Sequence, residues 1–195
     1  MVLSTPVSYQ LHSPKWWAFD AHVNLPLKPD YLWRIESGVV RTHTWLEDGS
    51  VITLGLWGTG EVVSKTLATI KPYQVESLTE VRATLLPISQ HPDVTTMLIS
   101  QIQQMNELTV IRSHKTVEMM LIKLLGWLAQ KFGREMNKGQ LIDVRLTHQD
   151  LADLLASSRV TITRTLSQLE QQGIIQRHPL HRILLREEDV WHYEI

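Results

Sequence analysis

The segment Leu146–Glu170, LTHQDLADLLASSRVTITRTLSQLE, constrains the fold of this chain more than any other. Its apolar residues recur at helical spacing in two groups, Leu151, Leu154 and Leu155, and then Ile162, Leu166 and Leu169. Ala152 is small enough to let two helices pack closely, and Ser157-Ser158 offers N-cap hydroxyls between the groups. The pattern predicts two short helices joined by a tight turn.

The second of these helices has a polar face. Since its three apolar residues must face a core, helical geometry turns six others outward: Arg159, Val160, Thr163, Arg164, Ser167 and Gln168. Arginine can pair with guanine O6 and N7, and threonine and valine methyls suit the thymine methyl group, so this face fits the major groove of DNA. The alternative is the solvated side of an amphipathic helix. The capped two-helix unit favours the first interpretation, because first-turn amides and hydroxyls also bind phosphate.

Length and charge limit what kind of DNA binder this is. The chain has 195 residues, of which 43% are apolar, which suits one large or two small domains, and we expect two. The net charge of −1 excludes a general polyanion binder, so a nucleic-acid footprint must be local. The stretch from Arg145 to Arg182 agrees, since it holds five arginines against three acidic residues.

The absence of cysteine excludes disulfides, thiolate catalysis and cysteine-ligated iron–sulfur clusters. The N-terminal sequence MVLSTPVSYQLHSPKWW lacks the basic and apolar segments of a signal peptide. No apolar run reaches the roughly 20 residues that span a bilayer. We therefore expect a cytoplasmic protein with no membrane contact.

Residues 31–88 have the pattern of an antiparallel β-roll or barrel. Aromatic and β-branched residues form short runs separated by turn signals at Ser37-Gly38, Asp48-Gly49 and Gly58-Thr59-Gly60. The clearest hairpin joins Val39–Trp45 to Val51–Trp57, because Asp-Gly supplies the positive φ of a tight turn. Five of the seven tryptophans lie before residue 60, and we expect core or dimer packing there rather than a ligand box.

A helical period begins after Pro87. The segment LISQIQQMNELTVIR carries an almost heptad-like stripe made of Leu98, Ile102, Met105, Leu108 and Ile111 or Arg112. A two-fold dimer seam is favoured over packing on the chain's own barrel, and both arrangements can coexist. A second helix is predicted from an N-cap at Thr116 to Gly133, with its broad apolar face in the core of a C-terminal domain. His114–Thr116 is then the inter-domain hinge.

A short hairpin is predicted after Gly173, which ends the helix of the polar face. Its strands are Ile174–Arg177 and Arg182–Leu185, and together they form a wing. His178 and His181 lie at its turn. Two histidines without a nearby third ligand are a poor metal site, so phosphate contact or solvent exposure is favoured.

The order of β-roll, long helix, hinge, helix, helix-turn-helix and wing resembles the Crp/Fnr superfamily of bacterial transcription regulators. The resemblance is close over 117–185, with LTHQDLADLLASSRVTITRTLSQLEQQGIIQRH, and extends through DYLWRIESGVVRTHTWLEDGSVITLGLWGTGEVV to most of 31–185. It implies an α+β fold with an N-terminal antiparallel β-roll like a cyclic-nucleotide-binding domain, a dimerisation helix and a C-terminal winged helix-turn-helix. The implied boundaries are 1–91, 92–115 and 116–195.

The resemblance also assigns roles to residues. Arg159 and Arg164 match the base-reading arginines, flanked by Val160 and Thr163, and the phosphate contacts are Thr147, His148, Ser158 and Thr161, to which the wing adds His178. In the cyclic-AMP receptor protein the position of Val160 holds a glutamate that accepts from cytosine. The R-V-T-x-T-R run instead resembles the global nitrogen regulator type of cyanobacteria. A TGT- or GTA-like half-site follows, with the two half-sites of a palindrome about one helical turn apart.

Two positions depart from the family pattern. Ala156 stands where the helix-turn-helix usually has glycine, and a positive φ there would cost on the order of 1 kcal/mol. In the sensor segment VVSKTLATIKPYQVES, Lys65 lies near the position of the cyclic-nucleotide glutamate and Lys71-Pro72 near the arginine-serine pair. Glu61 is the glutamate under another alignment, but no arginine occurs between residues 41 and 82 to clamp a phosphate. We expect no cyclic nucleotide and no other assigned cofactor, with haem ligation by one of the nine histidines left open.

These observations favour a homodimeric, sequence-specific DNA-binding transcription regulator without catalytic activity. An effector, if one exists, would set the spacing of the recognition helices through the hinge. The alternatives are a haem- or metabolite-gated sensor of the same fold, an effector-independent dimer, and a β-barrel enzyme fused to a DNA-binding domain. The enzyme is disfavoured because the barrel lacks metal, nucleophile and phosphate-loop motifs. The exposed loop Gly133–Gln140 either contacts RNA polymerase or is a solvated connector.

Overall fold

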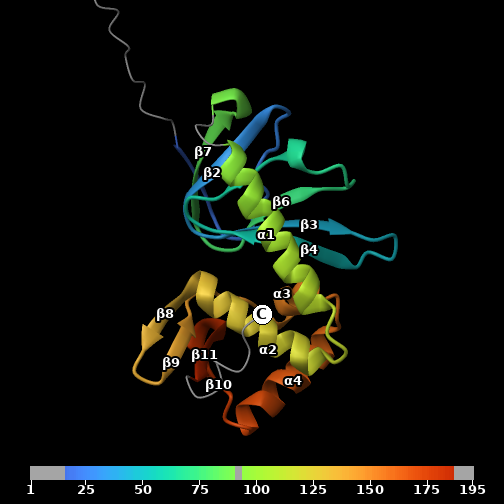
Figure 1. Ribbon diagram of the computed structural model, residues 1–195, viewed down its shortest axis with the longest axis vertical. Helices are drawn as coiled ribbons and strands as arrows, with labels where there is room; N and C mark the ends of the chain where they lie inside the picture. The colour runs from blue at the N-terminus through green and yellow to red at the C-terminus, as the bar shows by residue number, and fades with distance from the viewer. Residues whose placement is uncertain (1–15, 91–93, 187–195) are drawn as a thin grey trace, which may run out of the picture.

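The computed structural model describes residues 16–90 and 94–186. A β-sheet part occupies one end of the long axis and a mainly helical part the other, and a long helix connects them (Figure 1). The strands of the first part are β1 (Trp16–Phe19), β2 (Tyr31–Ser37), β3 (Val40–Trp45), β4 (Val51–Trp57), β5 (Val62–Val63), β6 (Gln74–Ser77) and β7 (Val81–Pro87). Short 3-10 turns follow β5 at Lys65–Leu67 and β7 at Ile88–Gln90.

The first part is an antiparallel β-roll of two sheets, ordered β1-β7-β2-β5 and β4-β3-β6. The predicted hairpin is confirmed, since Val40 pairs with Trp57 and Trp45 with Val51, and Gly49 has a φ of +84° at its turn. Strand β1 was missed because the predicted roll began at residue 31. The α+β fold class predicted from the sequence is confirmed.

The tryptophans of the roll divide between core and surface. Trp33 and Trp57 are 2% and 3% exposed and pack with Ile35, Val40 and other aliphatic residues. Of the expected core or dimer packing, the core part was wrong for the other three, because Trp16, Trp17 and Trp45 are 57%, 46% and 38% exposed in the single chain. Dimer packing of these three stays a prediction. Trp16 and Trp17 belong to the edge strand β1, where a side chain has neighbours on one side only.

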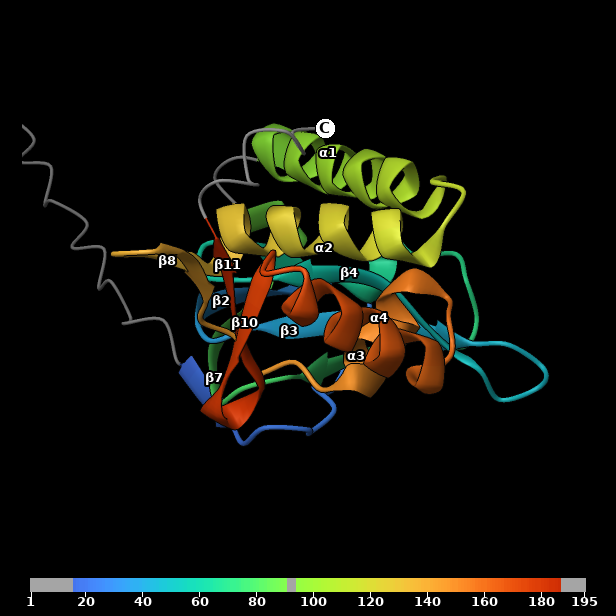
Figure 2. The same ribbon diagram turned by 90° about the horizontal axis from the view of Figure 1, so that it is seen from below.

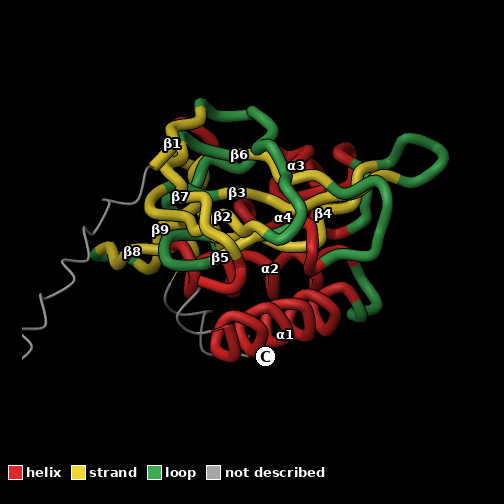
Figure 3. Tube along the Cα trace, turned by 90° about the horizontal axis from the view of Figure 1, so that it is seen from above, coloured by secondary structure: helices red, strands yellow, loops and turns green. Residues whose placement is uncertain are grey.

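Helix α1 (Val94–Arg112) runs along one side of the sheets, and α2 (Val117–Phe132) follows after a short turn (Figure 3). The stripe of α1 divides along its length. Leu108 and Ile111 are buried in the chain's own core, whereas Leu98, Ile102 and Met105 remain 41%, 58% and 59% exposed. Helix α2 begins as predicted, because the Thr116 side chain accepts a hydrogen bond from the Met119 amide.

The remaining elements surround the buried face of α2. They are β8 (Gly133–Met136), β9 (Gly139–Ile142), α3 (His148–Leu155), α4 (Arg159–Gln171), β10 (Ile175–His178) and β11 (Arg182–Arg186), with a 3-10 turn at Pro179–His181. Strands β10 and β11 form the predicted wing and continue into one sheet ordered β10-β11-β9-β8. Figure 2 shows α3, α4 and the wing at this end of the molecule.

The prediction of a loop at Gly133–Gln140 was wrong. This segment is a β-hairpin made of β8 and the start of β9. All four residues of β8 are exposed. The strand therefore has none of the apolar and polar alternation by which a half-buried strand is recognised. Gly139, with a φ of +137°, closes the turn.

Candidate nucleic-acid interface

The turn between α3 and α4 is tight because one residue adopts a left-handed conformation. Ala156 has φ 49° and ψ 45°, and its amide donates to the Ala152 carbonyl. The Ser157 amide donates to the same carbonyl at 3.0 Å. Ser158 then caps α4 by accepting from the Thr161 amide at 3.1 Å. The positive φ anticipated at Ala156 is thus present, in a residue that carries a Cβ.

Helix α4 separates into an inward and an outward face as predicted. Ile162, Leu166 and Leu169 are each 0% exposed. Arg159, Val160, Arg164 and Gln168 are exposed, and Thr163 and Ser167 are half-buried. Val160 is the exposed apolar side chain of this face, at 61%. The face therefore offers two guanidinium forks with a methyl-bearing surface between them.

Hydroxyl groups of α4 are engaged with the helix itself. Thr163 Oγ1 donates to the Arg159 carbonyl at 2.8 Å, and Ser167 Oγ donates to the Thr163 carbonyl at 3.1 Å. The Thr165 hydroxyl donates to the Thr161 carbonyl at 3.0 Å. Their hydrogens are used within the helix, so Thr163 and Ser167 present acceptor oxygens and carbon outward.

The start of α3 lies beside α4. Thr147 and Asp150 form a capping box, in which the Thr147 hydroxyl accepts from the Asp150 amide and the Asp150 carboxylate accepts from the Thr147 amide. His148 Nδ1 is 2.8 Å from Thr163 Oγ1, and Ser158 Oγ is 2.8 Å from Thr161 Oγ1. Two pairs of the predicted contact residues are thus brought together, while the Thr147 hydroxyl is committed to its cap.

The fifth predicted phosphate residue, His178, lies on the wing. Its Nε2 atom is buried and has no hydrogen-bond partner within the described residues. The neighbouring Arg177 pairs with Glu170 of α4, with Nε 2.7 Å from Oε2. This ion pair and the bond from the Arg177 amide to Glu170 fix the wing against the recognition helix.

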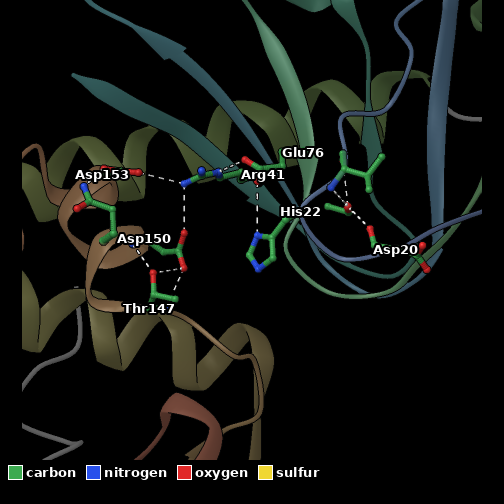
Figure 4. Close-up of polar contacts among 10 residues, drawn as sticks. Asp20, His22, Arg41, Glu76, Thr147, Asp150 and Asp153 are labelled. Atoms are coloured by element: carbon green, nitrogen blue, oxygen red, sulfur yellow. Dashed lines mark hydrogen bonds and ion pairs between the residues drawn. The ribbon is translucent and has the colours of Figure 1, made fainter. Parts of the chain in front are cut away.

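One cluster behind this interface was missed from the sequence. Arg41 of β3 lies 3.1 Å from Asp153 and 3.3 Å from Asp150, both on α3, and 2.8 Å from Glu76 of β6 (Figure 4). Arg112, at the end of α1, donates to the Leu154 carbonyl at 2.6 Å. The β-roll is therefore bonded directly to the first helix of the two-helix unit. No local signal predicts pairs between residues more than a hundred positions apart.

A pocket of about 280 Å³ lies between the roll and α1. It is lined mainly by apolar and aromatic residues, and its polar members besides Tyr73 are Thr42, Thr69, Gln101, Thr109 and Arg112. Burial lowers the pKa of Arg112 and raises that of Tyr73, which also lines the pocket. Lys65 and Lys71 are exposed and lie outside this lining.

Among the described residues, the other acidic and histidine side chains that could hold a ligand or a metal ion do not form a site in this pocket. The Glu61 carboxylate accepts hydrogen bonds from Lys131 and from the Gly58 amide, each at 2.7 Å. Glu61 is not part of the lining of the pocket between the roll and α1. Within 16–90 and 94–186, no three histidine, aspartate or glutamate side chains are arranged to hold a metal ion.

Comparison with known proteins decides the family. A Crp-like helix-turn-helix domain model matches residues 121–189. The regulatory protein CysR of Synechococcus elongatus is 36% identical over 159 residues, which cover 78% of this chain and 75% of CysR. The chain belongs to the Crp/Fnr family of transcription regulators. Helices α3 and α4 of this Crp/Fnr regulator lie within the matched helix-turn-helix domain.

Further relatives agree with this assignment. The global nitrogen regulator of Synechocystis is 30% identical over 114 residues, covering 53% of this chain and 51% of that protein. A CRP-family transcriptional regulator from Thermus thermophilus shares the fold with a TM-score of 0.77 at 21% identity, covering 91% of this chain and 95% of its own. FixK2 from Bradyrhizobium japonicum has the same TM-score at 17% identity, with 93% and 97% covered. In the described part of this Crp/Fnr chain, no helix is long and apolar enough to cross a membrane.

Proposed function

We propose that this Crp/Fnr regulator binds a palindromic DNA site as a homodimer and places α4 in the major groove of each half-site. The observation that carries the proposal is the exposed face of Arg159, Val160, Thr163 and Arg164 on a capped helix with a fully buried opposite side. Arginine forks at two positions five residues apart, at 159 and 164, suit guanine edges, and the Val160 methyls suit thymine. The likeness of the R-V-T-x-T-R run to the global nitrogen regulator type adds the expectation of a TGT- or GTA-like half-site.

The exposed end of the α1 stripe supports the homodimer. Leu98, Ile102 and Met105 are joined on the same helix by Ile99, which is 49% exposed. A run of exposed aliphatic side chains on one long helix is the kind of surface that a second copy covers in a two-fold seam. Two recognition helices related by that axis would read half-sites about one helical turn apart.

The sensor pocket supports independence from cyclic nucleotides. Its only cationic lining residue is Arg112, whose guanidinium is already bonded to backbone carbonyls of Leu154 and Thr53. A cyclic phosphate would find no free guanidinium there. A second candidate function, a regulator gated by a small and largely apolar metabolite, is favoured by the same pocket of about 280 Å³.

The β8–β9 hairpin is the surface that we propose for contact with RNA polymerase. Strand β8 is a fully exposed edge strand, and Met136 near its tip is 43% exposed. It projects from the helical end of the molecule beside the wing (Figure 1). An exposed edge of this kind offers backbone and side-chain groups to a protein partner.

The deciding experiment is selection of bound sequences from a random duplex pool at fixed salt, without added ligand. We expect enrichment of a two-fold TGT- or GTA-type site by the wild-type protein and loss of that enrichment with Arg159→Ala. The control is Arg82→Ala, which removes an exposed arginine of the β-roll. No enriched sequence with the wild-type protein, or equal enrichment with both variants, would contradict the proposal.

A further inference from the structure

A pocket of about 370 Å³ lies between the start of α3 and the wing, and its lining is rich in histidine and arginine side chains. Its polar lining residues are His148, Arg177, His178, His181 and Arg182, and no carboxylate is among them. Both arginines are already paired, Arg177 with Glu170 and Arg182 with Asp143 at 3.0 Å. Each arginine thus already has a carboxylate partner, and histidine is the lining residue type whose charge can change near neutral pH.

The hydrogen-bond network defines the tautomer of His148. The Thr163 hydroxyl directs its only hydrogen at the Arg159 carbonyl, so toward His148 it must accept. Nδ1 of His148 is consequently the protonated nitrogen of the neutral ring. Nε2 then carries a lone pair and becomes a donor only when the ring gains a second proton.

The other two histidines are placed to share in this chemistry. The rings of His148 and His181 are 6.3 Å apart, edge to face. His178 Nε2 is buried without a partner within the described residues, which is costly for a polar atom unless a ligand satisfies it. Leu180 and His181 both have positive φ, so the wing turn that carries His181 has a strained backbone.

Positive charge surrounds the site in the free protein. Burial, followed by the charges of Arg177, His181 and Arg159, lowers the pKa of His148. The charged and titratable groups that line the pocket or act on His148 are Arg159 on α4, Arg177 and His178 on β10, His181 at the wing turn and Arg182 on β11. The carboxylates nearest to them in the network are Asp150 on α3, Glu170 on α4 and Asp143, which follows β9. Each carboxylate already has partners. Asp150 binds Thr147 and Arg41, Glu170 binds Arg177, and Asp143 binds Arg134 and Arg182.

We propose that this pocket takes up a backbone phosphate of bound DNA together with a proton on His148, so that binding of the operator is proton-linked. The inference rests on the proposed function, and it adds that pH regulates DNA binding. A phosphate would bring the missing negative charge, accept from the newly formed Nε2–H of His148 and satisfy His178. Affinity for DNA would rise as the pH falls, by up to roughly tenfold per pH unit for each proton taken up.

The test measures Kd for the selected duplex by fluorescence anisotropy at fixed salt between about pH 8 and pH 5.5. We expect the wild-type protein to bind more tightly at low pH and His148→Gln to lose most of that slope. His148→Arg should bind tightly at every pH, since its charge is permanent. The control, His22→Gln, removes an exposed histidine of the β-roll and should keep the wild-type slope.

A second measurement uses only the wild-type protein, so it does not require that any variant folds. The Hε1 resonance of His148 in the wild-type protein should titrate at higher pH with the duplex bound than without it. Binding with the same pH slope in wild type and His148→Gln would overturn this inference and leave the proposed function intact, whereas no duplex binding at any pH would overturn the proposed function itself. An equal shift of the resonance with inorganic phosphate at matched ionic strength would overturn the assignment to a DNA phosphate.

Discussion

Arg41 Nη1 lies 3.1 Å from Asp153 Oδ2, so a strand of the β-roll is ion-paired with the first helix of the helix-turn-helix. The side chains of Arg41 and Asp153 are only 13% and 7% exposed. Asp150 and Glu76 bind the same guanidinium, which therefore sits among three carboxylates (Figure 4). The orientation of α3 relative to the roll thus depends strongly on one side chain.

Replacing Arg41 by methionine should destabilise the protein. The three carboxylates would lose their shared cation while remaining largely buried, and we expect the free energy of unfolding to fall by about 3 kcal/mol. Chemical denaturation measures this change. Arg34→Met is the control, because the Arg34–Glu36 pair is about one-third exposed on both sides and should contribute well under 1 kcal/mol. Equal losses in the two variants would contradict the prediction.

The stability of the protein should depend on pH through His43. Burial, and then the charge of Arg41, lowers the pKa of this histidine, and its Nδ1 is buried without a partner within the described residues. The unfolded chain therefore binds the proton more readily, so His43 contributes stability above about pH 6.5 that is lost as the pH falls toward the folded-state pKa. Thermal melts between pH 7 and pH 5 should show a smaller decrease for His43→Gln than for wild type. Parallel curves would refute this role of His43.

Ala156→Gly should stabilise the helix-turn-helix. Alanine has a φ of 49° there, and glycine removes the Cβ penalty of the left-handed conformation, so we expect a gain of up to about 1 kcal/mol in the free energy of unfolding. Ala152→Gly, in the buried interior of the same helix, should instead cost about 1 kcal/mol or more. The opposite signs of the two changes in denaturant unfolding are the check, and a loss at both positions would be evidence against this account.

Ile102→Glu should separate the proposed dimer. Its side chain is 58% exposed in one chain, and a carboxylate buried in a two-fold seam would face its own copy. Light scattering coupled to size exclusion should give twice the 22.5 kDa chain mass for wild type and a single chain mass for the variant. Gln103→Glu adds the same charge at the next exposed position of α1 and should leave the dimer intact. A monomeric wild-type protein would exclude the seam.

Local sequence patterns were sufficient for the helix-turn-helix. The boundaries of α4 follow from a serine cap at one end, Gly173 at the other and a strict apolar spacing between them. The β3–β4 hairpin was equally predictable, because an Asp-Gly turn lies between runs of β-branched and aromatic residues.

What the sequence did not reveal depends on contacts between distant residues or on surfaces without a pattern. Strand β8 is exposed throughout, and β1 is recognisable only through its pairing with β7. The ion pairs of Arg41 join residues that become neighbours only when the roll packs against α3. The roles of Arg159, Val160, Thr163 and Arg164 at base edges stay predictions, since exposure alone does not distinguish a DNA surface from a solvated one.

The continuous sheet β10-β11-β9-β8 would set the layout of a regulated promoter. Hydrogen bonds between neighbouring strands join the wing, which we propose to face DNA, to the outer edge of the β8–β9 hairpin, so the two surfaces cannot be displaced independently. A polymerase held at that edge would stand at a constant distance and angle from the operator. Functional operators would therefore lie at distances from the transcription start that differ by whole turns of about 10.5 base pairs.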